Sequence, residues 1–318
     1  MKLKISVIMA VRNDAINVRN SIVSMLDDIN KDDEVVIVDD ASSDESGSVV
    51  RELITNDARV TLITNPNNIG LAASLNIAAF NAKNELLCRM DSDDINIKGR
   101  VGALREAFES NNDLSLAGTN AFTFKVSSSQ REGLIRNPTR HGQLVTSLLF
   151  DSPMIHPSVI IRKSTFEDVG GYNEKYTRCQ DYELWCRMIK NGSVFQNIDI
   201  VGLGYRVNST GNKDKIASRF TFTTPIRDLY LKEVFEIHSE ESRQAHCFLC
   251  GDLTLIDSFS IKNVHLLVSA YEDILHKLDK KCFFKGVFRK TIKRFLTKPM
   301  VTAYLFYKLL VLFSKKGI

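Results

Sequence analysis

Two aspartates separated by one residue, Asp91 and Asp93, carry the clearest chemistry in this chain. They follow the apolar run 85–90, which is typical of a buried strand, so both carboxylates would leave the strand end toward the same volume. Mg²⁺ or Mn²⁺ takes oxygen ligands of this kind and keeps its other positions for phosphate and water. A cation held there would neutralise charge on a departing diphosphate. Two exposed loop carboxylates are the competing interpretation.

A second acidic pair, Asp39 and Asp40, closes the apolar run 34–38. A carboxylate at this point can accept a hydrogen bond from the N–H of uracil or another base. Helix capping, with Ser43 or Asp44 beginning the next helix, is the alternative. Because ligands of parallel sheets bind at the carboxyl ends of strands, both acidic pairs are expected at one edge.

Asp181 is the third candidate, because it begins a stretch with helical periodicity. Within residues 181–190, Leu184, Trp185 and Met188 fall on one helical face. The positive end of the helix dipole favours an ionised carboxylate at that position, and such a group can act as a general base toward a hydroxyl. Simple capping of the helix is the alternative.

The elements that must position these groups alternate between strand and helix, which implies a mostly parallel, Rossmann-like sheet flanked by helices. Strands are expected at 4–10, 34–38, 60–63, 85–90 and 157–162. Helices are expected at 15–29, 71–83, 143–150 and 181–190. Beyond about residue 213 the pattern becomes largely helical, and the polar run 208–215 is the candidate boundary.

Composition limits the possible partners. The chain is 44% hydrophobic and 25% charged, as expected of a folded protein. Residues 280–318 contain eleven Lys or Arg and no Asp or Glu, so the preceding part is net acidic, which argues against nucleic acid as a partner. The cysteines are irregularly spaced, and the C-x-x-C pair Cys247 and Cys250 lacks the partners of a zinc set, so we expect reduced helical thiols in a cytoplasmic protein.

Several segments together resemble the family 2 glycosyltransferases with the GT-A fold, specifically bacterial members that build surface polysaccharides. They are SVIMAVRN at 6–13, VDDASSDES at 38–46, NIGLAASLN at 68–76, RMDSDD at 89–94, HPS at 156–158, GGY at 170–172 and QDYELW at 180–185. Their order and spacing cover about residues 4–206, which makes the combination far more specific than any one motif.

The resemblance implies a nucleotide-binding half at 1–95, an acceptor half at 96–212 and a helical extension at 213–318. The residues implied to contact the nucleotide are Ala10, Arg12, Asp39, Asp40, Asn68 and Asp91. Asp93, with Asp91, would hold Mn²⁺ or Mg²⁺. Asp181 matches the catalytic base, and the acceptor site would be lined by Gly171, Tyr172, Trp185 and His156.

Two positions depart from the family pattern. Arg12 stands where an aromatic residue is common, so a guanidinium face or another base contact would replace stacking. Gln180 replaces the acidic residue that usually precedes the catalytic aspartate. Trp185 considered alone is a typical core residue, and only the motif assigns it to the acceptor.

The expected function is therefore inverting transfer of a sugar, with a UDP-sugar as the expected donor, to a hydroxyl of a lipid-linked saccharide in capsule, O-antigen or related synthesis. The chain lacks the Gly-rich phosphate loop of a sugar nucleotidyltransferase and the G-x-G-x-x-G of a dinucleotide oxidoreductase. A non-catalytic GT-A-like binding or assembly subunit is the alternative. The basic, aromatic-rich tail 280–318 would lie on the inner face of the cytoplasmic membrane, with docking on the protein body or on a partner as the competing interpretation.

Overall fold

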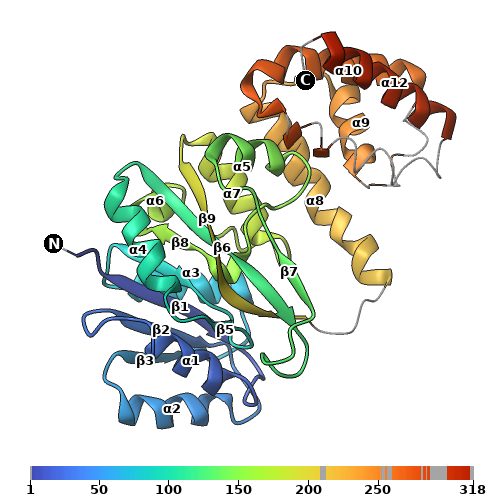
Figure 1. The fold of residues 1–318 in the computed structure, drawn as a ribbon. Helices are drawn as coiled ribbons and strands as arrows, with labels where there is room; N and C mark the ends of the chain where they lie inside the picture. The colour runs from blue at the N-terminus through green and yellow to red at the C-terminus, as the bar shows by residue number, and fades with distance from the viewer. Residues whose placement is uncertain are drawn as a thin grey trace. The chain divides into compact units, whose positions relative to one another are not determined.

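The computed structural model describes residues 2–207, 213–250, 252, 255, 260–280, 282–283, 285–286 and 299–315 (Figure 1). The chain forms two compact units. The first comprises Met1–Arg140, Met154–Leu184 and Asn191–Gly211, and the second comprises His141–Pro153, Trp185–Lys190 and Asn212–Ile318. Most of the candidate boundary, 208–212, and much of the basic tail, 287–298, lie outside the described residues.

The first unit is built on a nine-stranded sheet with the order β3-β2-β1-β4-β8-β6-β9-β5, and β7 pairs with β6. The strands are β1 (Ile5–Val11), β2 (Glu34–Asp39), β3 (Val60–Thr64), β4 (Leu86–Arg89), β5 (Ile95–Asn96), β6 (Leu114–Phe124), β7 (Gly133–Ile135), β8 (Ile160–Arg162) and β9 (Val194–Arg206). The pairs β1–β2, β1–β4, β2–β3 and β6–β9 are parallel, whereas β8 runs antiparallel between β4 and β6.

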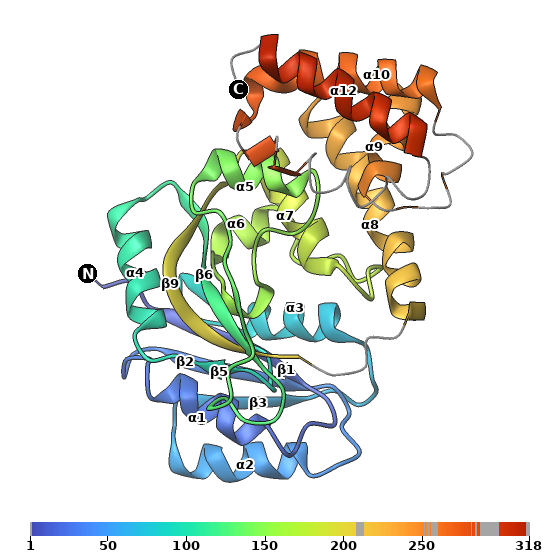
Figure 2. The same cartoon turned by 45° about the vertical axis from the view of Figure 1, so that its right-hand side comes forward.

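Helices cover both faces of the parallel half, as Figure 2 shows. Right-handed crossovers from β1 to β2 and from β2 to β3 place α1 (Val18–Leu26) and α2 (Ser46–Asn56) on one face. The connection from β3 to β4 reverses direction across the sheet, so α3 (Leu71–Asn81) lies on the other face. The unit also contains α4 (Arg100–Ser110), the short helix η1 (His156–Ser158), α6 (Lys163–Asp168) and the start of α7 (Gln180–Lys190).

Alternation along β1 explains why this strand is central. Ile5, Val7 and Met9 point to one face, where they join Val18 and Ile22 of α1 in the core, and all five side chains are fully buried. Burying a side chain of this size stabilises the fold by roughly 1.5–3 kcal/mol. The end of β1 is thereby fixed against α1, which positions the polar loop that follows.

The second unit is helical in its described residues. It contains α5 (His141–Leu148), the remainder of α7, α8 (Lys213–Val234), α9 (Glu240–Cys250), α10 (Ile261–Ile274), η3 (Leu275–Lys277) and α12 (Pro299–Lys315). Cys247 and Cys250 are buried free thiols on α9, as predicted, and His246 beside them bonds the Leu149 carbonyl at 2.7 Å. No helix among the described residues has the length and apolar character needed to cross a membrane.

The predicted strands 4–10, 34–38, 60–63, 85–90 and 157–162 are confirmed to within a few residues, and the α/β fold class is confirmed. The predicted helices at 15–29, 71–83, 143–150 and 181–190 are also present as α1, α3, α5 and α7. The two longest strands, β6 and β9, were not predicted. Together with β8 they extend the parallel half into a mixed sheet.

Candidate active site

The carboxyl ends of β1, β2 and β4 meet at one edge of the sheet. Val11 lies opposite Asp39 in the β1–β2 register, and Ile8 lies opposite Arg89 in the β1–β4 register. The backbone N–H of Asp40 donates to the Val11 carbonyl at 2.9 Å just beyond the last paired residues. The two acidic pairs predicted from the sequence therefore leave adjacent strands at the same edge.

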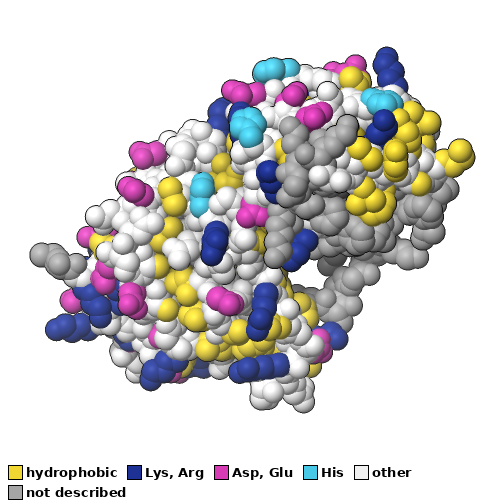
Figure 3. Space-filling model, turned by 45° about the horizontal axis from the view of Figure 1, so that its top comes forward, with side chains coloured by type: hydrophobic (Ala, Val, Ile, Leu, Met, Phe, Trp, Pro, Cys, Tyr) yellow, Lys and Arg dark blue, Asp and Glu magenta, His cyan; other side chains and the backbone are white. Residues whose placement is uncertain are grey.

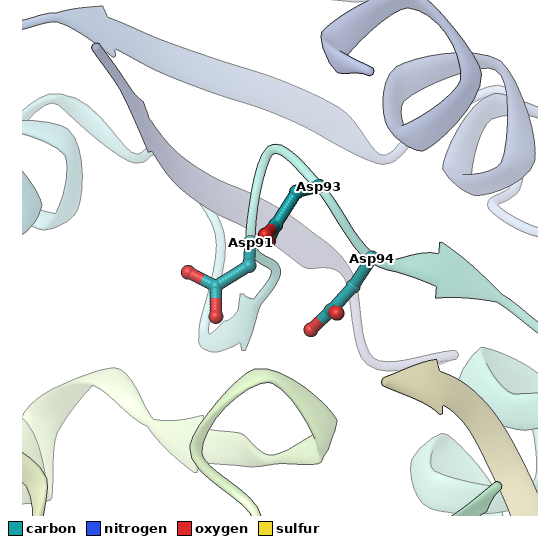
Figure 4. Close-up of side chains that lie close together, drawn as sticks. All are labelled: Asp91, Asp93 and Asp94. Carbon is teal, nitrogen blue, oxygen red and sulfur yellow. The ribbon is translucent and has the colours of Figure 1, made fainter. Parts of the chain in front are cut away.

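Three carboxylates gather beyond β4, one more than the D-x-D spacing predicted. One carboxylate oxygen from each of Asp91, Asp93 and Asp94 lies within 4.8 Å of the others, and Figure 4 shows all three on one short loop. Asp94 is almost fully buried, and its Oδ2 has no hydrogen-bond partner among the described residues. This loop concentrates like charges in a small, partly desolvated volume.

The crowding is visible in the acidity of the cluster. Burial, with the charges of Asp91 and Asp14, raises the pKa of Asp93 to about 6. Burial and the charge of Asp91 raise the pKa of Asp94 to about 8. Desolvation and like charges both disfavour the ionised form of these carboxyl groups. The raised pKa values therefore indicate that little positive charge lies close to Asp93 and Asp94.

Two arginines partly compensate. The Arg89 guanidinium, which is only 1% exposed, pairs with Asp91 through an Nη1–Oδ1 contact of 2.5 Å. The backbone N–H of Arg206 donates to Asp94 Oδ1 at 2.7 Å, and its Nε donates to the Asp93 carbonyl at 2.9 Å. Arg206 therefore holds the shape of the loop, whereas Arg89 opposes the charge of one carboxylate.

The loop after β1 is tied to the same cluster. Ser92 Oγ donates to Asp14 Oδ2 at 2.7 Å, and the Asp14 backbone N–H donates to Ser46 Oγ at 2.8 Å. Asn13 adopts a positive φ of 53°, a conformation that Asn tolerates, and its Oδ1 accepts from the Ser43 N–H at 2.8 Å. The ends of β1, β2 and β4 thus form one connected polar rim.

Asp40 organises the neighbouring loop. Its Oδ1 accepts from the Asn65 amide at 3.0 Å and from the Ile69 N–H at 2.9 Å, and its Oδ2 accepts from the Gly70 N–H at 2.8 Å. Burial opposes ionisation, but these hydrogen bonds outweigh it and lower the pKa of Asp40. The carboxylate is therefore ionised and fixes the loop that precedes α3.

The sequence analysis left two roles open for the acidic residues after β2, a nucleotide contact and capping of the next helix, and the contacts of Asp39 and Asp44 differ. Asp39 Oδ1 accepts from the Ser42 N–H at 3.0 Å, and its Oδ2 would lie 2.7 Å from a Cβ at Gly47. A Cβ at Gly47 would therefore displace the Asp39 carboxylate. Asp44 Oδ1 accepts at 3.0 Å from the N–H of Ser46, the first residue of α2, so Asp44 contacts the start of the helix while Glu45 occupies the N-cap position.

The remaining predicted nucleotide contacts lie around this rim. Ala10 is half-buried in β1 opposite Val38, and Arg12 is exposed one residue beyond the strand. Asn68 is exposed in the loop whose next two amides bind Asp40. These side chains are accessible at the strand ends, but no contact in the structure assigns them a ligand.

The acceptor-side residues form a second, neutral group. His156 Nε2 and Tyr172 OH share a hydrogen bond of 2.7 Å, and their rings meet edge to face. Burial, reinforced by the nearby Arg89 charge, lowers the pKa of His156 well below its ordinary value. Burial also raises the pKa of Tyr172, to which the charges of Asp181 and Asp91 add. Both side chains are uncharged at neutral pH.

The glycine loop before Tyr172 is fixed by α3. Asn76 Oδ1 accepts from the Tyr172 N–H at 2.8 Å, and Asn76 Nδ2 donates to the Tyr172 carbonyl at 2.9 Å. Gly171 has a φ of 68°, and a Cβ there would lie 2.8 Å from Asn76 Oδ1. Glycine is thus needed at this position both for its conformation and for the close approach of Asn76.

Asp181 is the second residue of α7 and is half-buried in the first unit. Cys179, immediately before the helix, has a φ of 58°, and its carbonyl accepts from the Glu183 N–H at 3.0 Å. Trp185 on the same helix is completely buried. Its burial fits the core interpretation that the sequence left open, and its acceptor contact stays a prediction.

The acidic loop fits a divalent cation. All three donor groups are carboxylates, which suit hard cations, and a buried Asp94 oxygen lacks a partner among the described residues. Asp93 and Asp94 would hold the ion, with Asp91 shared between the ion and Arg89. Among the described residues this is also the only group of acidic, His or Cys ligands close enough for a metal.

Sequence reasoning missed four members of the site. Asp94 belongs to the quoted RMDSDD segment, and its position directly after Asp93 could have identified it. Arg89 and Asp14 also lie in or beside strand ends that the sequence singled out. Arg206 contacts the loop from more than 100 residues away in sequence, so no local pattern pointed to it.

Comparisons with known proteins agree with this geometry. The family model described as Glycosyl transferase family 2 matches residues 6–170, just over half of the chain. A curated relative from Escherichia coli, UDP-Gal:alpha-D-GlcNAc-diphosphoundecaprenol beta-1,3-galactosyltransferase, is 24% identical over 264 residues, covering 83% of this chain and 86% of that protein.

Solved structures share the fold. S. aureus TarS 1–349 in complex with UDP-GlcNAc superposes with a TM-score of 0.61 at 16% identity, covering 93% of this chain and 92% of that one. The Pyrobaculum calidifontis mannosyltransferase PcManGT, in complex with GDP-Man and Mn²⁺, gives a TM-score of 0.57 at 15% identity, covering 94% and 88%. These likenesses confirm the GT-A type of α/β fold.

Proposed function

We propose, from the fact that this chain belongs to glycosyl transferase family 2, that it transfers a sugar from a UDP-sugar to a hydroxyl of a lipid-linked saccharide with inversion at the anomeric carbon. The observation that carries the proposal is that the acidic loop Asp91, Asp93 and Asp94 lies near the neutral His156–Tyr172 group. The charges of Asp181 and Asp91 both add to burial in raising the pKa of Tyr172. The acidic loop and the candidate base therefore both lie near Tyr172.

Asp181 is the proposed general base. It stands in the first turn of α7, where the N-terminal end of the helix dipole stabilises a carboxylate. It takes the proton of the acceptor hydroxyl, whose oxygen then attacks the anomeric carbon from the face opposite the diphosphate. A positioned base of this kind contributes about 10²- to 10⁴-fold in rate.

The donor is held at the rim of strand ends. Asp40 keeps the loop 65–70 in place, which leaves Ala10, Asp39 and Asn68 beside the base and ribose. Mn²⁺ or Mg²⁺, when bound by Asp93 and Asp94, supplies Lewis-acid stabilisation of the leaving diphosphate. The Mn²⁺ of the mannosyltransferase structure supports this assignment, as does the unpartnered oxygen of Asp94.

The proposal of a uridine base and a lipid-linked acceptor is based on the relatives of this chain. The E. coli relative is named for a UDP-galactose donor and a diphosphoundecaprenol-linked acceptor, and the TarS structure contains UDP-GlcNAc. An acceptor embedded in a bilayer would require the enzyme at the membrane surface. We therefore assign the basic tail 280–318 to the inner face of the cytoplasmic membrane.

A donor screen tests the proposal. Purified protein is incubated with UDP-, GDP- and dTDP-sugars and Mn²⁺ or Mg²⁺, with and without EDTA, while nucleotide release is followed. We expect metal-dependent release with a UDP-sugar that disappears in Asp181→Asn but persists in Asp32→Asn, which removes an exposed carboxylate outside the site. If calorimetry detects no metal-dependent binding of any sugar nucleotide, the proposal fails.

A further inference from the structure

The last described helix, α12, exposes a continuous apolar line. Met300 is 83% exposed, Tyr307 60% and Leu310 40%, and Ala303 is exposed between them. The spacings of three, four and three residues place these four side chains along one face of an α-helix. Large exposed apolar side chains arranged in this way mark an interaction surface rather than isolated surface residues.

The opposite face of α12 is already used. Leu305 and Leu309 are buried, and α12 packs against α10. Tyr304 OH and His265 Nε2 on α10 share a hydrogen bond of 2.8 Å. The helix is therefore docked on its own unit, and the apolar line remains on its free side.

The charge of this region indicates which partner covers the apolar line. The region 280–318 has eleven basic residues and no acidic one, and α12 itself contains no Asp or Glu. A second copy of the chain would bring an equally basic region to a two-fold contact, whereas an anionic lipid surface would attract it. At 1.5 Å per residue the 17 residues of α12 extend about 25 Å, which is short of the roughly 30 Å hydrocarbon core.

We infer that α12 lies flat in the interface of an anionic bilayer while it remains docked on α10. Met300, Tyr307 and Leu310 then enter the lipid. In Figure 3, hydrophobic side chains gather over the C-terminal helices at the upper right. This inference rests on the membrane association proposed above and deepens it, because it assigns the contact to one face of one helix. It does not depend on the transfer chemistry.

Vesicle co-sedimentation tests the face. The full-length protein is mixed with vesicles of phosphatidylcholine, alone or with phosphatidylglycerol. We expect binding only with phosphatidylglycerol, and Tyr307→Glu/Leu310→Glu to weaken it about tenfold or more, because both changes charge the inserted face. Leu134→Glu is the matched control and should bind as the wild type does, because Leu134 of β7 in the first unit is 50% exposed, between the values of Leu310 and Tyr307.

A fluorescent probe makes the test independent of binding strength. Trp185 is the only tryptophan and is fully buried, so it gives a constant background. Tyr307→Trp should shift to the blue on adding phosphatidylglycerol vesicles, and Leu134→Trp should not. Circular dichroism and UDP-sugar binding by each variant show that folding and the donor site are intact.

Each other outcome overturns a defined part. If deletion of 296–318 releases the protein but the double glutamate variant binds as the wild type does, the tail anchors the protein through another face. If the deleted form remains bound, the tail is not the anchor, whatever the donor screen shows. A third outcome is that the wild type does not bind vesicles but forms a dimer, and that the double variant is monomeric. In that case a second copy of the chain, not a bilayer, covers the apolar line.

Discussion

The acidic loop and the His156–Tyr172 pair, which are the proposed donor and acceptor sides of the site, have opposite electrostatic properties. The donor loop places three carboxylates, those of Asp91, Asp93 and Asp94, beside one buried guanidinium, so its acidic groups outnumber the positive charge paired with them. On the acceptor side, His156 and Tyr172 satisfy each other and remain neutral. The acidic loop therefore offers a charge that a cation would balance, whereas the His156–Tyr172 pair is satisfied within the folded chain.

The two sides also differ in how their loops are held. The acceptor loop is fixed by two hydrogen bonds from Asn76 and by a glycine that cannot be replaced without a clash. The donor loop is fixed through its backbone by Arg206, which leaves its carboxylates poised but strained by like charge. Substitutions on the two sides should therefore change different measured quantities.

The largest effect should follow Asp181→Asn. Loss of the base should lower kcat by about 10²- to 10⁴-fold, while the dissociation constant for the donor stays within about twofold because Asp181 belongs to the acceptor side. Steady-state kinetics with calorimetry for donor binding measure both values. A variant that keeps its kcat would remove Asp181 from the mechanism, and Asp32→Asn controls for the loss of a carboxylate elsewhere.

Asp93→Asn and Asp94→Asn should act on the cation. Each removes a charged oxygen ligand, so the affinity for Mn²⁺ without donor should fall at least about 10- to 100-fold, the range seen when even an outer-shell partner is lost. Calorimetric titration of the protein with Mn²⁺ alone measures this without relying on turnover. Equal affinity in the wild type and Asp94→Asn would show that Asp94 is instead a protonated structural carboxyl, which Asn can replace.

Without metal, the donor side should make the protein less stable as the pH rises. The pKa of Asp94 is raised to about 8 and that of Asp93 to about 6, chiefly by burial, from an ordinary value of 3.8. The folded chain therefore holds protons that the unfolded chain releases, so the free energy of unfolding contributed by these groups falls between about pH 4 and 8.

Thermal melts in EDTA across that range should show a decline of a few degrees, smaller in Asp94→Asn and reduced by saturating Mn²⁺. The His156–Tyr172 group predicts the opposite slope below about pH 6.5, because burial keeps His156 neutral in the folded chain whereas the unfolded chain binds a proton there. Tyr172 is neutral in both states over this interval and contributes no slope. Identical pH profiles for the wild type and Asp94→Asn would argue that the carboxylates are better solvated than the structure indicates.

The sequence predicted the parallel half of the fold because its strands are short, largely apolar runs, two of which, β2 and β4, lead into acidic clusters. It missed β6 because Ser115, Thr119 and Asn120 interrupt the apolar pattern, although all three are buried. Asn120 donates to Asp199 of β9 at 2.8 Å, a contact between residues 79 apart that no local pattern contains. The β6–β9 register also shifts at bulges, which break the period of two in both strands.

The same limit applies to the site. Asp91, Asp93 and Asp181 were found because each stands at the end of a recognisable element. Arg206 was missed because its role depends on the return of β9 to the acidic loop. Burial is equally invisible in the sequence: the motif assigns Trp185 to the acceptor site, and no local pattern shows that its side chain is completely enclosed.

The smallest predicted effect belongs to the acceptor side and follows Tyr172→Phe. The ring remains, but the buried His156 Nε2 loses its 2.7 Å hydrogen bond to the phenol, which should cost about 1–3 kcal/mol of unfolding free energy. Mn²⁺ affinity should not change, and the KM for acceptor should rise more than the KM for donor. A double-mutant cycle with His156→Ala should give a coupling energy of about 1 kcal/mol, because either change alone breaks the same bond. Additive losses would show that the His156–Tyr172 hydrogen bond carries no coupling energy. A changed Mn²⁺ affinity in Tyr172→Phe would instead show that the two sides are not electrostatically separate, and that Arg89, which adds to burial in lowering the pKa of His156 while pairing with Asp91, couples them.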